Sequence, residues 1–176
     1  MVKVFLDSGA EVDAENEDGR TPLCRAAEDI VKLLLERGAD PNITNKWGRT
    51  PLCWAAEEGH EDIVKLLLEH GADPNITNKN GSAPLHGAAY KGHEDIVKLL
   101  LEHGADPNIT NKCGRTPLHG AALYGHKDSV KLLLEHGADP HITDVVCGHI
   151  IFYRQNTLNL VGNIHDDVDD AQRNSL

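Results

Sequence analysis

The chain has 176 residues, a formal net charge of −11 and a hydrophobic fraction of 40%. The sequence is acidic and contains no basic stripe, which argues against nucleic acid as a partner. No apolar stretch approaches the length that a membrane span requires. The four cysteines include no Cys-x-x-Cys pair, and the first residues lack the long apolar core of a secretory signal, so we expect a cytoplasmic protein.

The chain repeats itself at a fixed interval. The segment TPLCWAAEEGHEDIVKLLLEHGADPN (50–75) returns as APLHGAAYKGHEDIVKLLLEHGADPN (83–108) and again as TPLHGAALYGHKDSVKLLLEHGADPH (116–141). Equivalent prolines, such as Pro51 and Pro84, stand 33 residues apart. A period of this length predicts a stack of one supersecondary unit, and such stacks present a continuous binding surface.

Within one repeat, the expected elements follow in a fixed order. The segment 45–48, NKWG, is typical of a turn. Thr50 and Pro51 predict the start of a first helix, because Thr caps free backbone N–H groups and Pro suits the first helical position. Gly59 breaks that helix. The apolar run 63–68 then predicts a second helix that needs cover on several sides, which stacked neighbours provide.

These residues carry a family resemblance. The string G-x-TPLH-x-AA-x-x-GH…IV-x-LLL…GAD-x-N resembles the ankyrin repeat over residues 2–144. The resemblance implies an all-α ankyrin-repeat solenoid, in which antiparallel helix pairs are joined by projecting β-turn fingers and a concave face of fingers and first helices binds other proteins. We divide the chain into a half repeat 1–16, a shortened repeat 17–45, full repeats 46–78, 79–111 and 112–144, and a non-repeat segment 145–176.

The front of the chain departs from the pattern twice. Residues 2–11 match only the second helix of a unit and its exit, which suggests a fragment or truncated gene, or else a self-association surface. In the shortened repeat, Pro22 and Pro51 are 29 residues apart, because no counterpart of 57–60 follows Ala27. We expect a distorted, weak unit there, in which the second helix starts late or both helices fuse.

After Asp144 the match to the repeat fails. Residues 145–153 are expected to pack on the last repeat as an improvised cap, or to form a short strand or helix. The rest of the tail is polar, with four aspartates within 166–170. Such a composition buries little apolar surface, so we expect this end to be mobile.

Histidines and cysteines recur at repeat positions rather than in ligand clusters. His60 and its equivalents share one position, and His70 and its equivalents share another. Equivalent residues of stacked helices lie about 8–10 Å apart, too far to share a metal ion, so we expect no metal and no other cofactor. The same spacing excludes a disulfide between Cys24 and Cys53, which we expect to be buried. Cys113, at a finger tip, is expected to be an exposed, reactive thiol.

The family resemblance also implies that the Thr and His of the TPLH string hydrogen-bond to each other near the helix start. Thr116 and His119 are the one pair that keeps both members, because Thr21 and Thr50 face Cys and His86 faces Ala. A lost Thr cap costs on the order of 1 kcal/mol. We therefore expect the repeats to differ in stability, with the last full repeat best formed.

The near-identical repeats differ most on the expected concave face. Trp47 lies at a finger tip, and Tyr90 and Tyr124 precede the inter-helix glycines, at positions that the family uses for partner contact. Exposed aromatic residues are enriched in binding hot spots. Trp54 is expected mostly to pack between repeats. The predicted partner-binding residues are Trp47, Arg49, Glu57, Glu58, Asn80, Tyr90, Lys91, Cys113, Arg115, Leu123 and Tyr124.

No catalytic motif is present, so we do not expect an enzyme. The predicted function is recognition of another protein through the concave face. Three alternatives stay open. The chain is the recognition arm of a larger protein, or an effector delivered into a host cytosol; it is the substrate of an asparaginyl hydroxylase at Asn42, Asn75 and Asn108; or it self-associates weakly through its uncapped front half repeat.

Overall fold

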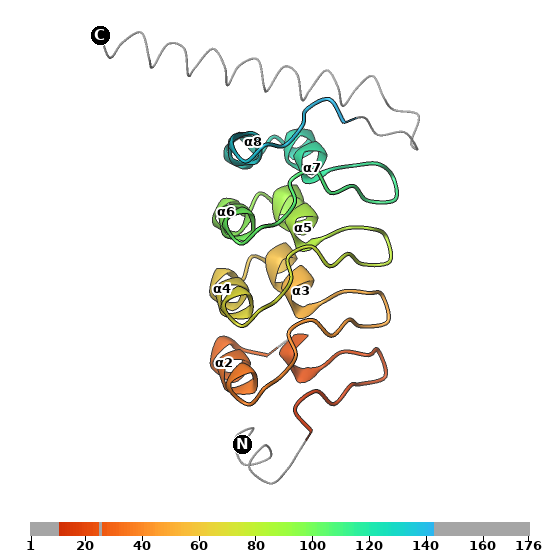
Figure 1. Cartoon of the computed structure of the whole chain (residues 1–176), viewed down its shortest axis with the longest axis vertical. Coiled ribbons are helices and arrows are strands. Elements are labelled where there is room, and N and C mark those ends of the chain that lie inside the picture. The colour runs from red at the N-terminus through yellow and green to blue at the C-terminus, as the bar shows by residue number, and fades with distance from the viewer. Residues whose placement is uncertain (1–10, 25, 143–176) are drawn as a thin grey trace, which may run out of the picture.

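The computed structural model describes residues 11–24 and 26–142. Within these ranges it contains seven α-helices, one 3-10 helix and no strand. The helices stand in two columns and the fingers project from one side (Figure 1), which confirms the predicted all-α solenoid. In chain order the elements are η1 (Pro22–Cys24), α2 (Glu28–Glu36), α3 (Pro51–Glu58), α4 (Glu61–Glu69), α5 (Pro84–Lys91), α6 (Glu94–Glu102), α7 (Pro117–Tyr124) and α8 (Lys127–Glu135).

The first helix of each full repeat begins and ends where the sequence predicts. In α3, the Thr50 hydroxyl accepts the N–H of Cys53 at 3.2 Å, and Pro51 is the first helical residue. The helix ends at Gly59, whose φ of 83° is left-handed and therefore favours glycine. The helices α5 and α7 end in the same way at Gly92 and Gly125.

The core is one continuous column between the two rows of helices. Leu52 of α3 and Val64 and Leu67 of α4 are fully buried, and so are their equivalents in the following repeats. The buried pair Ala55 and Ala56 adds little volume on α3, so neighbouring first helices pack closely. Each repeat thus buries its apolar faces against the next one, as a solenoid requires.

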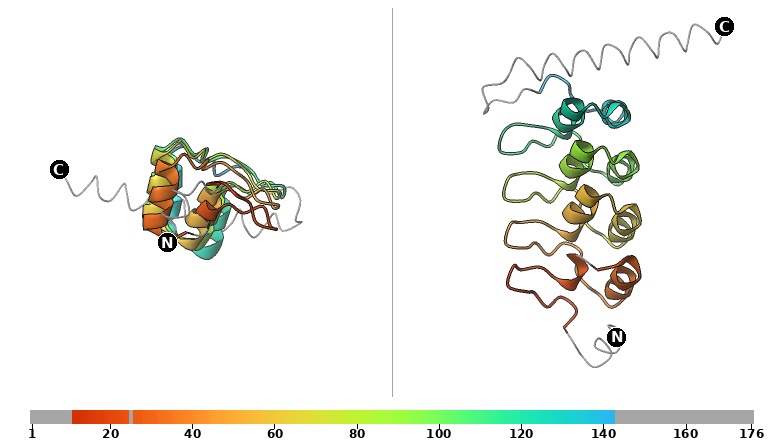
Figure 2. Two further views of the ribbon diagram at one scale, coloured as in Figure 1. Left: turned by 90° about the horizontal axis from the view of Figure 1, so that it is seen from below. Right: turned by 180° about the vertical axis from the view of Figure 1, so that it is seen from behind.

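The fingers are joined to one another by backbone hydrogen bonds. The N–H of Lys46 donates to Asp18 O, and the N–H of Lys79 donates to Trp47 O, each at 2.9 Å. The N–H of Lys112 continues the series to the next finger. Seen along the stack, the fingers all project to the same side of the helices (Figure 2, left). This ladder fixes the spacing of the finger tips.

The shortened repeat is accommodated in neither of the two expected ways. Its first helix is reduced to the 3-10 turn η1, and α2 begins at Glu28, the counterpart of Glu61 in the next repeat. Ala27 precedes it in an extended conformation, with φ −65° and ψ 156°. The second helix therefore neither starts late nor fuses with the first. The reason is that α2 packs its buried Val31 and Leu34 in the column, which holds its position, so the first helix loses the turn.

The missing turn of the first helix leaves a hollow of about 590 Å³ beside Trp54 and His60. In the later repeats, the ring of His93 donates from Nε2 to Glu57 O of the preceding repeat at 3.1 Å, and His126 donates likewise to Tyr90 O. The shortened repeat lacks a residue equivalent to Glu57. The ring of His60 packs instead against Trp54, with their centroids 4.8 Å apart.

Both expected irregular ends fall mostly beyond the described residues. Only 11–16 of the half repeat 1–16 is described, and the segment 145–176 lies outside the description. Across the described part of the chain, no helix combines the length and the apolar character needed to cross a membrane.

Candidate functional site

A groove follows the side of the stack where the fingers meet the first helices. Its volume is about 820 Å³, a size typical of sites that accept a ligand or several side chains. It extends from Arg20 and Cys24 in the shortened repeat to Arg115 and Leu123 in the last full repeat. We call this hollow the finger groove. It lies on the face that the sequence assigns to partner contact.

Most of the predicted partner-binding residues line this one groove. Three do not: Lys91 and Tyr124, which adjoin it beside Tyr90, and Cys113. The common role of these residues in binding stays a prediction, but the groove joins residues from three full repeats into one contiguous surface. The predicted residues that line the groove are Trp47, Arg49, Glu57, Glu58, Asn80, Tyr90, Arg115 and Leu123.

Trp47 stands at the finger edge of the groove and is 48% exposed. Its backbone N–H donates to Asn45 Oδ1 at 2.9 Å, which holds the finger turn that carries the indole. The guanidinium of Arg20, from the preceding finger, lies 5.3 Å from the ring centroid, within range of a cation–π interaction. The indole is therefore positioned by its neighbours while much of its surface faces solvent.

Tyr90 and Tyr124 form an exposed aromatic pair at the helix edge of the groove. They are 45% and 49% exposed, and their ring centroids lie 4.3 Å apart at 60°. Their hydroxyls share a hydrogen bond of 2.7 Å, and the ammonium of Lys91 lies 6.0 Å from the Tyr90 ring. Such a pair offers a large apolar area at little cost in side-chain entropy, because each ring holds the other.

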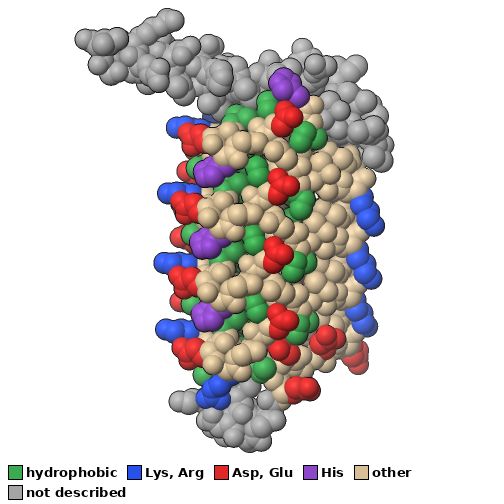
Figure 3. Space-filling model, viewed as in Figure 1, with side chains coloured by type: hydrophobic (Ala, Val, Ile, Leu, Met, Phe, Trp, Pro, Cys, Tyr) green, Lys and Arg blue, Asp and Glu red, His purple; other side chains and the backbone are tan. Residues whose placement is uncertain are grey.

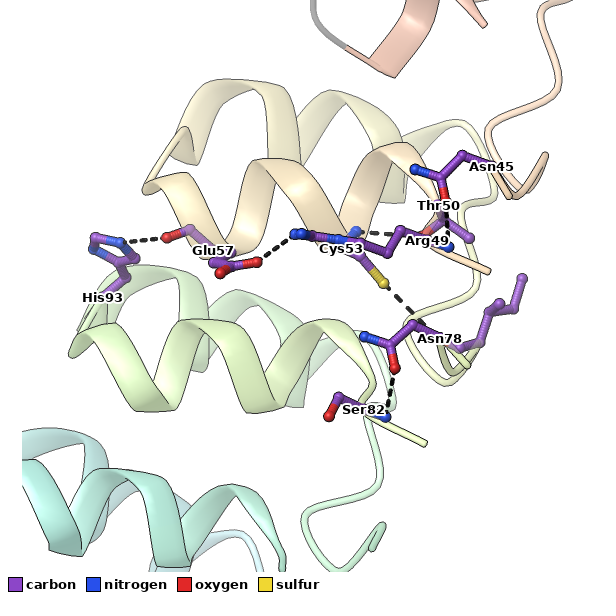
Figure 4. Close-up of polar contacts among 9 residues, drawn as sticks. Asn45, Arg49, Thr50, Cys53, Glu57, Asn78, Ser82 and His93 are labelled. Carbon is purple, nitrogen blue, oxygen red and sulfur yellow. Dashed lines mark hydrogen bonds and ion pairs between the residues drawn. The ribbon is translucent and has the colours of Figure 1, made fainter. Parts of the chain in front are cut away.

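Arg49 crosses the groove from the finger to the last turn of α3. Its guanidinium forms an ion pair with Glu57, which lies beside it in Figure 4. Both side chains are about one-third exposed, so the pair contributes about 0.2–1 kcal/mol and is open to exchange with a partner's charges. His93 of the next repeat donates to Glu57 O, which ties the same turn to α5 and α6.

The floor of the groove contains two glycines whose role the sequence reading missed. Gly87 and Gly120 occupy the position of Trp54 in successive first helices, and all three line the groove. Trp54 is half-buried against the core, which confirms the expected packing role, and it also lines the groove. The sequence shows that glycine replaces Trp54 at the equivalent position of the next two repeats, but only the structure shows that these glycines line the groove.

His86 lies on the groove floor and joins two repeats. Its Nδ1 accepts the N–H of Ala83 at 3.2 Å, and its Nε2 donates to Arg115 O at 3.0 Å. Burial lowers the pKa of this imidazole below its usual value. His119 at the equivalent position accepts from both the hydroxyl and the N–H of Thr116, which confirms the Thr–His pair expected in the last full repeat.

The described cysteines are free thiols. Cys24 and Cys53 are buried as expected, and burial raises the pKa of the Cys53 thiol, which disfavours the reactive thiolate. The prediction of an exposed thiol at Cys113 is wrong in degree, because the side chain is half-buried. Its finger is stacked on the preceding finger through the N–H of Lys112, which removes part of its exposure.

The asparagines predicted as hydroxylation sites form a ladder between repeats. Asn75 Nδ2 donates to Gly104 O at 2.9 Å, and Asn75 Oδ1 accepts the N–H of Asp106 at 2.8 Å. Asn42 and Asn108 make the same two bonds. The amide groups are therefore engaged in holding the stack, and hydroxylation stays a prediction.

Charged side chains follow the repeat rather than gathering in clusters. Acidic, basic and histidine side chains form columns along the stack in Figure 3. Among the described residues, no group of three or more His, Cys, Asp or Glu side chains is placed to hold a metal ion.

Comparison with models of protein families gives a match. A family model described as ankyrin repeats (3 copies) matches residues 1–78 and 70–144. A search of the curated proteins found no match. The matched ranges include every helix and finger described above and most of the chain. Since the repeat, the helix pairs, the fingers and the family model agree, the chain belongs to the ankyrin-repeat family.

Proposed function

We propose that this chain is a non-catalytic module that binds another protein through the finger groove and the aromatic pair beside it. Ankyrin repeats are generally protein–protein interaction modules. The observation that carries the proposal is that the four large hydrophobic residues exposed in the described part of the chain gather at the finger groove and beside it. They are Trp47, Tyr90, Leu123 and Tyr124. Exposed aromatic anchors beside a groove are the usual centre of a protein interface.

The proposal is tested by removing the three aromatic side chains together. The variant carries Trp47→Ala, Tyr90→Ala and Tyr124→Ala. We expect proteins captured by the intact chain to be lost from this variant, because each substitution removes a hot-spot side chain without touching the core. Capture is quantified by mass spectrometry against the control below.

The matched control removes three exposed lysines from the second helices, on the opposite side of each helix pair. It carries Lys65→Ala, Lys98→Ala and Lys131→Ala. We expect this control to capture the same proteins as the intact chain. A captured set that is identical for all three chains contradicts the proposal. Light scattering on the same samples shows whether the chain binds itself: a dimer that the aromatic variant loses would make this face a self-association surface.

A further inference from the structure

Gly120 lies in helix α7 and lines the groove. Neither its backbone conformation nor its packing requires a glycine at this position. It lies outside the set of glycines with positive φ. A Cβ at Gly120 would lie 3.4 Å from the nearest atom, Cα of Tyr90, which is an ordinary contact. At Gly87 the same Cβ would come within 3.1 Å of Glu57 Cβ, so close helix packing accounts for that glycine. A helical glycine costs about 1 kcal/mol relative to alanine. At Gly120 the helix backbone, which carries no side chain there, lines the groove directly.

The space beside Gly120 is bounded by apolar side chains. Trp54, at the same helical position two repeats earlier, lines the same groove. Tyr90 and Leu123 follow Gly87 and Gly120 by three residues, so they stand on the same face of their helices and flank the hollow. We call this part of the finger groove the glycine hollow. Its shape and its walls suit a bulky apolar side chain.

More basic than acidic side chains line the groove around the glycine hollow, although the chain as a whole is acidic. Four basic side chains line the groove, Arg20, Arg49, Lys79 and Arg115, against the two acids Glu57 and Glu58. The chain as a whole carries −11. A positive groove in an acidic protein attracts a segment of negative charge, because low-dielectric walls concentrate the local field. Figure 3 shows basic side chains following the finger edge of the stack.

The length of the groove sets the length of its occupant. It passes the first helices of four successive repeats, and neighbouring helices pack about 10 Å apart, so it extends for about 30 Å. An extended peptide advances about 3.3 Å per residue, so about nine residues fill the groove.

We propose that the finger groove takes an extended acidic segment of a partner protein, which inserts one bulky apolar side chain into the glycine hollow and places carboxylates against the finger bases. This inference rests on the proposed function and specifies its partner. The apolar side chain is desolvated between Tyr90 and Leu123. The carboxylates face Lys79 and the finger arginines.

The test uses the full chain and a display library of random peptides of about twelve residues, slightly longer than the groove. We expect enriched peptides to carry several Asp or Glu residues around one Trp, Phe, Leu or Met. The leading peptide is then synthesised, and its dissociation constant is measured by fluorescence polarisation. Gly120→Leu should weaken binding by at least about tenfold, because the leucine fills the hollow. Gly120→Ala should have a smaller effect in the same direction.

The contribution of charge to peptide binding is tested with two variants of equal net charge. Lys79→Glu lies in the groove, whereas Lys98→Glu lies on the exposed side of α6. We expect Lys79→Glu to weaken binding several-fold and more strongly at low salt, and Lys98→Glu to change it less than about twofold. Thermal melts monitored by circular dichroism establish that Gly120→Leu is folded, which its helical backbone and ordinary contacts predict.

Three outcomes overturn this inference. Enriched peptides that lack acids, or that bind Gly120→Leu as well as the intact chain, show that the hollow and its charge do not select the partner. If those peptides still depend on Tyr90 and Tyr124, the proposed function survives and only the inference fails. A library that yields no enrichment excludes an extended peptide as the occupant. A dimer that Gly120→Leu abolishes shows that a second copy of the chain fills the groove.

Discussion

At the scale of single residues, His86 makes stability depend on pH. Its pKa is lowered by burial, while the unfolded chain keeps the ordinary value of 6.5. As pH falls through this value, the unfolded state takes up the proton first, so the free energy of unfolding decreases. We expect His86→Gln to reduce this decrease in urea titrations between about pH 7.5 and 5.5. His70→Gln, on an exposed helix end, is the control, and equal slopes for both variants would contradict the prediction.

A second residue-scale prediction concerns Ser129 in α8. This side chain is 1% exposed, and its hydroxyl is the one buried side-chain polar atom in the described residues without a hydrogen-bond partner. Ile63 and Ile96 occupy the same position in the preceding repeats. We expect Ser129→Ala to raise the free energy of unfolding by about 1 kcal/mol in urea titration, because it removes an unsatisfied hydroxyl. The half-exposed Ser82→Ala should stay within about 0.5 kcal/mol, and a destabilised Ser129→Ala would refute the reasoning.

At the scale of elements, the shortened repeat is the place where the stack is incomplete. Inserting Glu-Glu-Gly-His between Ala27 and Glu28 recreates the sequence of the next repeat. The insertion should extend η1 into a full helix, cover the hollow beside Trp54 and offer His60 a carbonyl acceptor like that of His93. We expect the amides of α2 to exchange hydrogen about tenfold more slowly, which corresponds to about 1.4 kcal/mol of local stability.

The control for this insertion is Gly-Ser-Gly-Ser at the same place. It supplies the same length but weak helix propensity and no histidine, so it should not slow exchange. Equal protection from both insertions would show that chain length alone, rather than the missing helical turn, limits this repeat.

At the scale of the whole molecule, the asparagine ladder joins each repeat to the next. Asn75→Ala removes two hydrogen bonds across one junction and should cost about 1–3 kcal/mol. Because a solenoid is stabilised by nearest-neighbour interfaces, a weak junction lets its two sides unfold separately. Trp47 and Trp54 both lie before this junction, so we expect unfolding by tryptophan fluorescence to occur at lower urea than unfolding by circular dichroism.

The control for the junction is Asn80→Ala, at an exposed finger tip of the next repeat. We expect its two transitions to coincide, as in the intact chain. Coincident transitions in Asn75→Ala would mean that packing alone, without the ladder, couples the repeats.

Much of the fold was predictable because its causes are local. Thr50, Pro51 and Gly59 set the limits of α3 through capping and a left-handed residue, and the period of the repeat requires the same limits elsewhere. The groove was predictable in part, since eight of the eleven residues expected to bind a partner line it. The glycine hollow was not predicted, because the space beside a glycine is defined by side chains of neighbouring repeats, whose positions the sequence does not give.

The sequence by itself determined that this protein is a stack of helix pairs, because a repeated apolar pattern can be buried only against copies of itself. It also predicted eight of the residues that line the groove. The tertiary structure alone decided how the shortened repeat is accommodated: packing of Val31 and Leu34 in the column holds α2 in place, so the first helix gives way. It alone decided that Gly120, Trp54 and Leu123 line one groove, because residues on different repeats are brought together only through the stacking of the helices.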